Sequence, residues 1–333
     1  MRRRTMQVPP PLLRAGLRAA RPVILSPRIS LATTRRLVDA LTRVRAPRGT
    51  RCERTQIGGV ACEQATPPTA TDGRILLYLH GGGYALGSAR AYRGFAAQLA
   101  QRVGAVAVVP DYPLAPEHPF PAALDDVLTV YRGLLQSGYD PGRIILAGDS
   151  AGGGLSLALA MSLREQGLPQ PAVIGLICPW LDLAADAART RVALRDPLIV
   201  PSIVTEWVDP YLGGRAATDP LISPVLGDLS GLPPIVVHSA GDDPLAVDVD
   251  ALVAAVGAHP GGRIEHTRYS RRWHVFHLQI GLLADAAVAV DDLADALRRH
   301  AGRKKRDATA TDGVSALHVA LRPPHPPRRR QPT

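Results

Sequence analysis

The segment Arg143-Ile144-Ile145-Leu146-Ala147-Gly148-Asp149-Ser150-Ala151-Gly152 decides the fold of this chain. Its first five residues are an apolar run that predicts a strand, and residues 151–163 have the composition of a helix. Gly-x-Ser-x-Gly alone also fits a small-residue loop at a strand end. Between a strand and a helix, however, it predicts a nucleophile elbow, a strained turn that exposes the hydroxyl of Ser150 above the sheet. Gly148 and Gly152 are expected because larger side chains would clash in so tight a turn.

A glycine-rich loop upstream points to the same chemistry. The aliphatic run 75–79 leads directly into His80-Gly81-Gly82-Gly83. Glycines let backbone N–H groups face a substrate, where they stabilise the negative oxygen that forms when a serine attacks a carbonyl group. We assign these donors to Gly82, Gly83 and Ala151, and we expect His80 to anchor the loop by hydrogen bonding. A phosphate-binding loop would instead end in Gly-Lys-Ser/Thr, which this one does not.

An acid and then a histidine are expected further along the chain. The strand predicted over 235–239 runs into Gly241-Asp242-Asp243-Pro244. Asp242 and Asp243 both lie at the carboxyl end of that strand, so either would face the same crevice as Ser150. A turn or cap role is the alternative for Asp242. Asp248 is expected to be a solvated charge of the following helix.

The histidines that follow are His259, His266, His274, His277 and His300. His266 lies within the alternating strand 264–269, so sheet packing would fix its side chain, and His259 lies in a Pro-Gly-Gly turn. His274 follows the next loop, at the position the fold requires, and His277 lies about one helical turn further on. We therefore predict that His274 takes the proton of Ser150 while the aspartate stabilises the imidazolium.

Taken together, these motifs resemble the hormone-sensitive-lipase family of α/β-hydrolase carboxylesterases and lipases, most closely its actinobacterial branch. The matching segments, in the family's order over about residues 74 to 280, are His80 to Tyr84, Asp111 to Ala122, Gly148 to Gly153, Ala240 to Leu245, and His274-Val275-Phe276. The resemblance implies an α/β fold, with a mostly parallel sheet, flanking helices and a helical cap. It also puts the acid at Asp243, in the family's Gly-x-Asp-Pro-Leu pattern.

The same resemblance implies hydrolysis of small carboxylic esters, with short to medium acyl chains, and no metal or organic cofactor. Two alternatives stay open: a non-catalytic ligand-binding relative, and a membrane-docked lipase for longer acyl chains. The plant gibberellin receptors are such non-catalytic relatives, and they lack the histidine that is present here as His274. The chain departs from the family at Pro113, at Gly154 and at Arg271-Arg272 before the histidine. These departures concern specificity, since the predicted triad is intact.

Charge is concentrated at the two ends of the chain. The 333 residues carry a net charge of +10, but residues 1–55 alone carry +12 and residues 301–333 carry +6, which leaves −8 for residues 56–300. A nucleic-acid-binding protein would place its cations on the folded module, interleaved with aromatic residues. We therefore expect no nucleic-acid partner. The basic ends are either solvated faces or a contact with an anionic membrane surface.

The sequence suggests a cytoplasmic protein with three parts. No apolar run has the length of a signal peptide or of the roughly 20 residues of a spanning helix, and three cysteines imply no disulfide framework or metal spacing. Residues 1–50 are expected to form a basic helical arm that belongs to the cap. The catalytic domain would comprise residues 51–301, with a cap insertion at about 181–234, where strand–helix alternation lapses. Residues 302–333 are predicted to be a disordered basic tail.

Overall fold

An eight-stranded sheet forms the centre of the protein in a computed structural model that describes residues 7–26, 28–71, 73–184, 195–199 and 201–301. Along the sheet the strand order is β1-β2-β4-β3-β5-β6-β7-β8. The pairs β1–β2 and β2–β4 are antiparallel and all other pairs are parallel, which confirms the predicted mostly parallel sheet. The strands are β1 (Arg51–Ile57), β2 (Val60–Thr66), β3 (Arg74–Leu79), β4 (Ala105–Pro110), β5 (Ile144–Asp149), β6 (Val173–Ile177), β7 (Ile235–Ala240) and β8 (Ile264–Tyr269).

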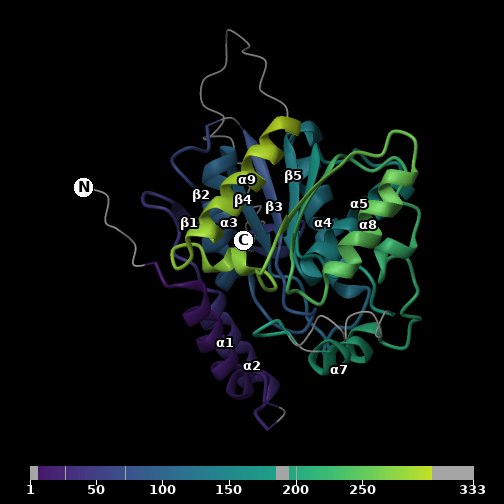
Figure 1. Ribbon diagram of the computed structural model, residues 1–333. Coiled ribbons are helices and arrows are strands. Elements are labelled where there is room, and N and C mark those ends of the chain that lie inside the picture. Colours follow the sequence, from purple (N-terminus) through teal and green to yellow (C-terminus); the bar gives the residue numbers. More distant parts are fainter. Residues whose placement is uncertain (1–6, 27, 72, 185–194, 200, 302–333) are drawn as a thin grey trace, which may run out of the picture.

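Helices cover both faces of the sheet (Figure 1). Side chains alternate between the two faces along each strand, so Leu76 and Tyr78 of β3 pack on one side and Ile75 and Leu77 on the other. The first face is covered by α3 (Ala89–Val103) and α9 (Ala284–His300). The opposite face is covered by α4 (Ala122–Gln136), α5 (Ala151–Glu165) and α8 (Ala246–Ala258). Because the inner strands are buried on both faces, they appear in the sequence as continuous aliphatic runs.

The register of the central strands brings distant loops together. Leu79 at the end of β3 pairs with Gly148 near the end of β5, and Asp149 pairs with Ile177 at the end of β6. Parallel strands end at the same edge of a sheet, so the loops that follow β3, β5 and β6 emerge side by side. This edge carries the residues predicted to be functional.

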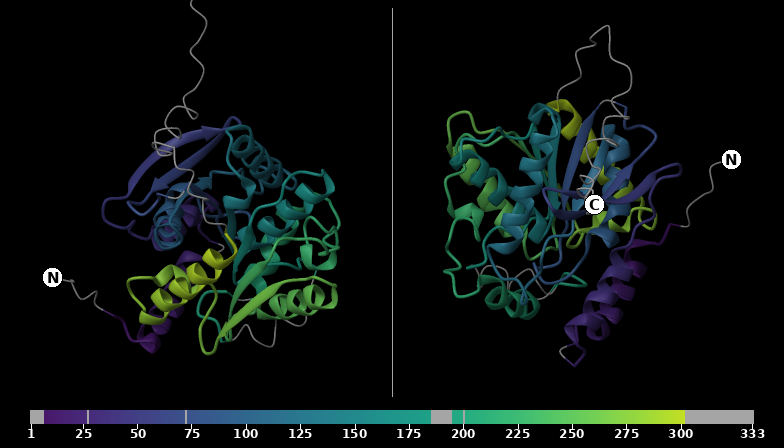
Figure 2. Two further views of the ribbon diagram at one scale, coloured as in Figure 1. Left: turned by 90° about the horizontal axis from the view of Figure 1, so that it is seen from above. Right: turned by 180° about the vertical axis from the view of Figure 1, so that it is seen from behind.

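Three further helices gather at one end of the molecule. These are α1 (Pro10–Ile24), α2 (Leu31–Thr42) and α7 (Pro201–Leu212), which lie at the same end in Figure 1 and in the right panel of Figure 2. Short helical turns occur at η1 (Pro141–Arg143), η2 (Pro224–Leu226) and η3 (Phe276–Gln279). None of the helices in the described part of the chain has the length and apolarity needed to span a membrane. The predicted tail, residues 302–333, and residues 185–194 of the predicted cap lie outside the described residues.

One expectation about charge is wrong. Asp248 of α8 is not solvated but only 2% exposed. Its Oδ2 accepts hydrogen bonds from the backbone N–H groups of Leu181 (2.8 Å) and Asp182 (3.1 Å). The carboxylate therefore links α8 to the backbone just after β6, where strand–helix alternation lapses. Sequence alone did not reveal this role because its partners are main-chain groups 66 and 67 residues away.

Candidate active site

The turn after β5 holds Ser150 in a strained backbone conformation. Its φ is 51° and ψ is −124°, a region that residues other than glycine rarely adopt. A Cβ on Gly152 would lie 2.1 Å from the carbonyl oxygen of Leu79, and one on Gly148 would lie 2.3 Å from the carbonyl oxygen of Gly152. Neither position therefore accepts a side chain. The turn sits at the start of α5, as the strand–turn–helix pattern predicted.

Three side chains from separate loops meet at this turn. His274 Nε2 lies 2.9 Å from Ser150 Oγ, and His274 Nδ1 lies 2.9 Å from Asp243 Oδ2. The backbone N–H of Leu245 donates to the other carboxylate oxygen of Asp243 at 2.9 Å. Asp243 is fully buried, and Ser150 and His274 are each 9% exposed. The arrangement has the connectivity of a serine–histidine–aspartate triad.

The competing candidates lie elsewhere. Asp242 turns to the arm, where its Oδ2 lies 2.6 Å from Arg14 Nη2. His277 is buried beside His238, with 3.2 Å between its Nε2 and Nδ1 of His238. His266 contacts a serine hydroxyl within the sheet, as its place in β8 suggested. Of the candidate acids and histidines, the structure brings only Asp243 and His274 to Ser150.

The charge around His274 favours the protonated ring. Burial alone would lower the pKa of His274, but the neighbouring carboxylates of Asp243, Asp196 and Asp149 outweigh it and the pKa is raised. A nearby negative charge stabilises an imidazolium, the state in which a histidine holds the proton of a serine. The electrostatics therefore suit general-base chemistry at Ser150.

The loop after β3 and the first residue of α5 present unpaired donors near the serine. Within the described part of the chain, the backbone N–H groups of Gly82, Gly83 and Ala151 donate to no protein acceptor. Gly82 has φ of 125°, and a Cβ there would lie 2.2 Å from the carbonyl oxygen of Leu86. Position 82 therefore accepts only glycine. The amides of Gly82, Gly83 and Ala151 are available to an oxyanion.

Two side chains hold this loop in place. Asp149 Oδ1 accepts from the backbone N–H of Gly81 at 3.0 Å and from the hydroxyl of Tyr78 at 2.7 Å. His80 stacks on Tyr112 with ring centroids 4.3 Å apart, and its Nδ1 lies 2.8 Å from the carbonyl oxygen of Gly81. His80 is thus placed as an anchor. Asp149 was not expected to act here, although its position inside the Gly-x-Ser-x-Gly turn was a signal that it lies beside the site.

Aromatic side chains of α7 cover the same loop. Tyr211 is stacked on Tyr84 at a centroid distance of 3.7 Å, and Phe120 meets Tyr211 edge-on at 6.0 Å. A Cβ on Gly83 would lie 2.8 Å from the indole of Trp207, so this ring lies directly against the backbone of the loop. The space beside the amide of Gly83 is therefore bounded by a large aromatic side chain.

Arg271 and Arg272 lie on the arm side of the histidine loop. Together with Arg14, Arg18 and Arg268 they line a cavity of about 780 Å³ between α1 and the connection from β8 to α9, and neither Ser150 nor His274 is among its lining residues. Arg272 forms an ion pair with Asp285. These arginines therefore face the arm helix.

Besides Asp149, two more residues at the site were missed by sequence reasoning. Asp196, in the segment before α7, accepts a hydrogen bond from the backbone N–H of His274 at 2.7 Å. Arg14 of α1 donates to Asp242, to the carbonyl oxygen of Arg271 at 2.9 Å and to that of Arg195 at 2.8 Å. Both act across more than 70 residues and mainly on main-chain atoms, so no local motif marks them.

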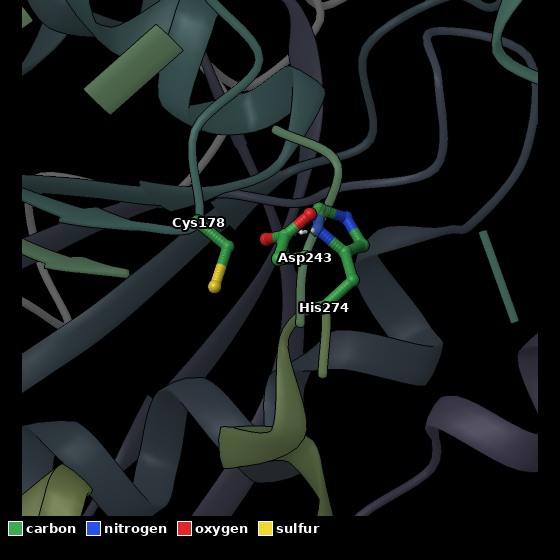
Figure 3. Close-up of side chains that lie close together, drawn as sticks. All are labelled: Cys178, Asp243 and His274. Carbon is green, nitrogen blue, oxygen red and sulfur yellow. Dashed lines mark hydrogen bonds and ion pairs between the residues drawn. The ribbon is translucent and has the colours of Figure 1, made fainter. Parts of the chain in front are cut away.

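One cluster contains donor atoms of the kind that bind metals. Ligand atoms of Cys178, Asp243 and His274 lie within 4.8 Å of one another (Figure 3). However, the imidazole and the carboxylate already bond to each other, and burial raises the pKa of the Cys178 thiol well above its usual value. A metal needs the thiolate, which this environment disfavours. The donor set is therefore better suited to a triad than to a metal centre.

Comparison with known proteins gives a consistent result. A family model described as the alpha/beta hydrolase fold matches residues 76–278. A Mycobacterium tuberculosis protein provisionally named acetyl-hydrolase LipR is 53% identical over 290 residues, covering 87% of this chain and 94% of that one. An acetyl-hydrolase of Streptomyces hygroscopicus is 39% identical over 236 residues, covering 71% and 79% of the two chains.

Solved structures agree with these relatives. A crystal structure of an esterase from the bacterial hormone-sensitive lipase family superposes with a TM-score of 0.83 at 36% identity, over 89% of this chain and 99% of that one. A hormone-sensitive lipase from a metagenome library superposes with a TM-score of 0.84 at 33% identity, over 89% and 100% of the chains. The similarity therefore extends over most of the chain.

Proposed function

Because the chain belongs to the α/β-hydrolase family, in its hormone-sensitive-lipase group, we propose that it is a serine ester hydrolase that works through an acyl-enzyme on Ser150. The observation that carries this proposal is the unbroken chain of hydrogen bonds from Ser150 Oγ through the imidazole of His274 to the buried carboxylate of Asp243, each 2.9 Å long. Relatives named as acetyl-hydrolases and esterases support the same chemistry.

In the proposed reaction, Ser150 Oγ attacks the ester carbonyl carbon as His274 Nε2 takes its proton. Asp243 holds the ring and stabilises the imidazolium. The carbonyl oxygen becomes negatively charged and accepts hydrogen bonds from the amides of Gly82, Gly83 and Ala151. The tetrahedral intermediate then expels the alcohol, which receives the proton from His274. A water molecule activated by His274 releases the acid and restores Ser150.

We further propose short acyl chains as the preferred substrates. The indole of Trp207 lies against Gly83, which limits the room beside the proposed oxyanion donors. The two relatives named as acetyl-hydrolases are consistent with a small acyl group. In this proposal α1, α2 and the described residues of the segment 181–234 act as a cap over the site, and α7 supplies the aromatic wall.

The test combines a substitution with a series of substrates. Ser150→Ala is expected to reduce kcat for p-nitrophenyl acetate by about 10⁴-fold or more, since removal of a triad serine leaves only residual catalysis. A fluorophosphonate probe should label the wild type once per chain and should not label the variant. Activity of the wild type should fall from acetate to laurate esters. Unchanged turnover in a folded Ser150→Ala protein would contradict the proposal.

A further inference from the structure

The carboxylate of Asp196, which is not part of the triad, accepts a hydrogen bond from the backbone of His274. Asp196 Oδ2 accepts from the backbone N–H of His274 at 2.7 Å, and Oδ1 accepts from the backbone N–H groups of Leu198 and Ile199, both at 2.8 Å. The side chain is 1% exposed. One buried carboxylate thus bridges the segment before α7 and the loop after β8.

The histidine loop needs such external support. Arg271 and Val275, which lie on either side of His274, have φ angles of 56° and 46°. Positive φ is unfavourable for both residue types, so the loop keeps this shape only where surrounding contacts impose it. The hydrogen bond from His274 N–H to Asp196 falls between the two strained positions.

The same carboxylate lies in the electrostatic environment of the ring. Asp196 is one of the charges that raise the pKa of His274. Burial, with the charge of Asp243 adding to it, raises the pKa of Asp196 above that of an ordinary aspartate. The other ionisable or charged groups around the histidine and its loop include Asp243, Asp149, Cys178, His277, Arg14 and Asp242, together with Arg271, Arg272 and the Asp285 that pairs with Arg272.

We propose that Asp196 is a positioning residue, which fixes the main chain of His274 for proton transfer and holds a second negative charge near the imidazole. This inference rests on the proposed role of His274 as the general base. It gives residues 195–199, which precede α7, a part in the reaction itself. The segment is in turn tied to α1, because Arg14 donates to the carbonyl oxygen of Arg195 at 2.8 Å.

Asp196→Asn tests both parts of the proposal. Asparagine has a single carbonyl oxygen, so the backbone N–H of His274 or those of Leu198 and Ile199 lose their acceptor. The substitution also removes the negative charge. We expect kcat per active site to fall by about 10- to 100-fold with little change in KM, since small displacements of a catalytic group have effects of this size. The acid limb of the kcat/KM profile should move to lower pH, because a charge that raises the pKa of His274 is gone.

The controls separate this role from simple loss of stability. Asp140 also caps a turn, accepting from the backbone N–H of Gly142 at 2.9 Å, but it lies before β5 at the opposite edge of the sheet. Asp140→Asn should leave kcat and the acid limb unchanged. Active sites are counted with a fluorophosphonate, so a partly unfolded sample does not mimic a slow enzyme. If Asp196→Asn fails to fold, Asp196→Glu keeps the charge and displaces it; kcat should then fall while the acid limb stays in place.

The outcomes distinguish the two proposals. Wild-type protein that the fluorophosphonate does not label would overturn the proposed function. Normal labelling of the wild type, together with unchanged kcat and an unmoved acid limb in Asp196→Asn, would overturn only the role of Asp196. If only Asp196→Glu folds, a kcat equal to that of the wild type in this variant would likewise overturn the role of Asp196.

Discussion

The two halves of the site are held together by different kinds of interaction. The serine half follows β3 and β5, which are hydrogen-bonded neighbours, and its shape depends on glycines that touch each other's backbones. The histidine half follows β7 and β8, and its loops are tied by side chains from remote segments, above all Arg14 and Asp196. Local sequence therefore determines the first half, whereas the second depends on long-range contacts. Substitutions in each half should show this difference.

The largest expected effect is in the serine half. Gly82→Ala would place a Cβ 2.2 Å from the carbonyl oxygen of Leu86, so the loop must move and the N–H of residue 82 with it. Loss of one oxyanion donor reduces kcat by about 10²- to 10³-fold, which steady-state kinetics with p-nitrophenyl acetate will measure. Gly73→Ala is the matched control, because Gly73 also has positive φ (67°) but no atom within 4 Å of its Cβ position. Equal activity of the two variants would show that catalysis does not depend on the position of the N–H of residue 82.

A smaller effect is expected in the histidine half from Arg14→Gln. The change removes the guanidinium that links Asp242 to the carbonyl oxygens of Arg195 and Arg271, and that lies 5.1 Å from the ring centroid of Trp273. We expect kcat to fall about tenfold with KM nearly constant, because the loops that carry Asp243 and His274 lose a common tie. Thermal unfolding and kinetics should be compared with Arg36→Gln, an exposed arginine of α2. Wild-type kcat in a folded Arg14→Gln protein would show that the arm does not position the site.

The smallest effect is expected where an arm helix meets the serine half. Arg35 of α2 donates to the carbonyl oxygens of Ala85 (2.8 Å) and Ala115 (2.9 Å) and pairs with Glu117. Since Asp149 already fixes that loop, Arg35→Gln should change kcat less than about twofold. The exposed ion pair should contribute at most about 1 kcal/mol to stability.

This ion pair has a defined pH dependence. The hydrogen bond from Arg35 lowers the pKa of Glu117 from 4.5 to about 2. A lowered pKa in the folded state means that the stabilisation is complete above pH 4.5 and is lost as the pH falls toward 2. The difference in unfolding free energy between wild type and Arg35→Gln, measured with urea at pH 7 and pH 3, should therefore shrink at the lower pH. A difference that grows on acidification would exclude Glu117 as the partner that matters.

The same contrast explains what the sequence could predict. Ser150, the glycine loop and the parallel strands were predictable because each depends on residues within a few positions of one another. Chain order and the strand ends predicted His274 and an acid at Asp242 or Asp243, and the family resemblance selected Asp243. The roles of Asp196 and Arg14 were not predictable, because both residues bind main-chain atoms of loops that are distant in the sequence. Asp248 was misjudged for the same reason, since its partners are backbone amides beyond β6.

The position of α9 has a consequence for folding during synthesis of the chain. This helix, the last one described, packs beside α3 on the same face of the sheet, although almost 200 residues separate them. A ribosome releases the serine turn long before it releases the histidine loop and α9. The growing chain must therefore hold an uncovered aliphatic surface on that face of the sheet until residues 284–300 have been translated, and Ser150 can meet His274 only after residue 274 has emerged.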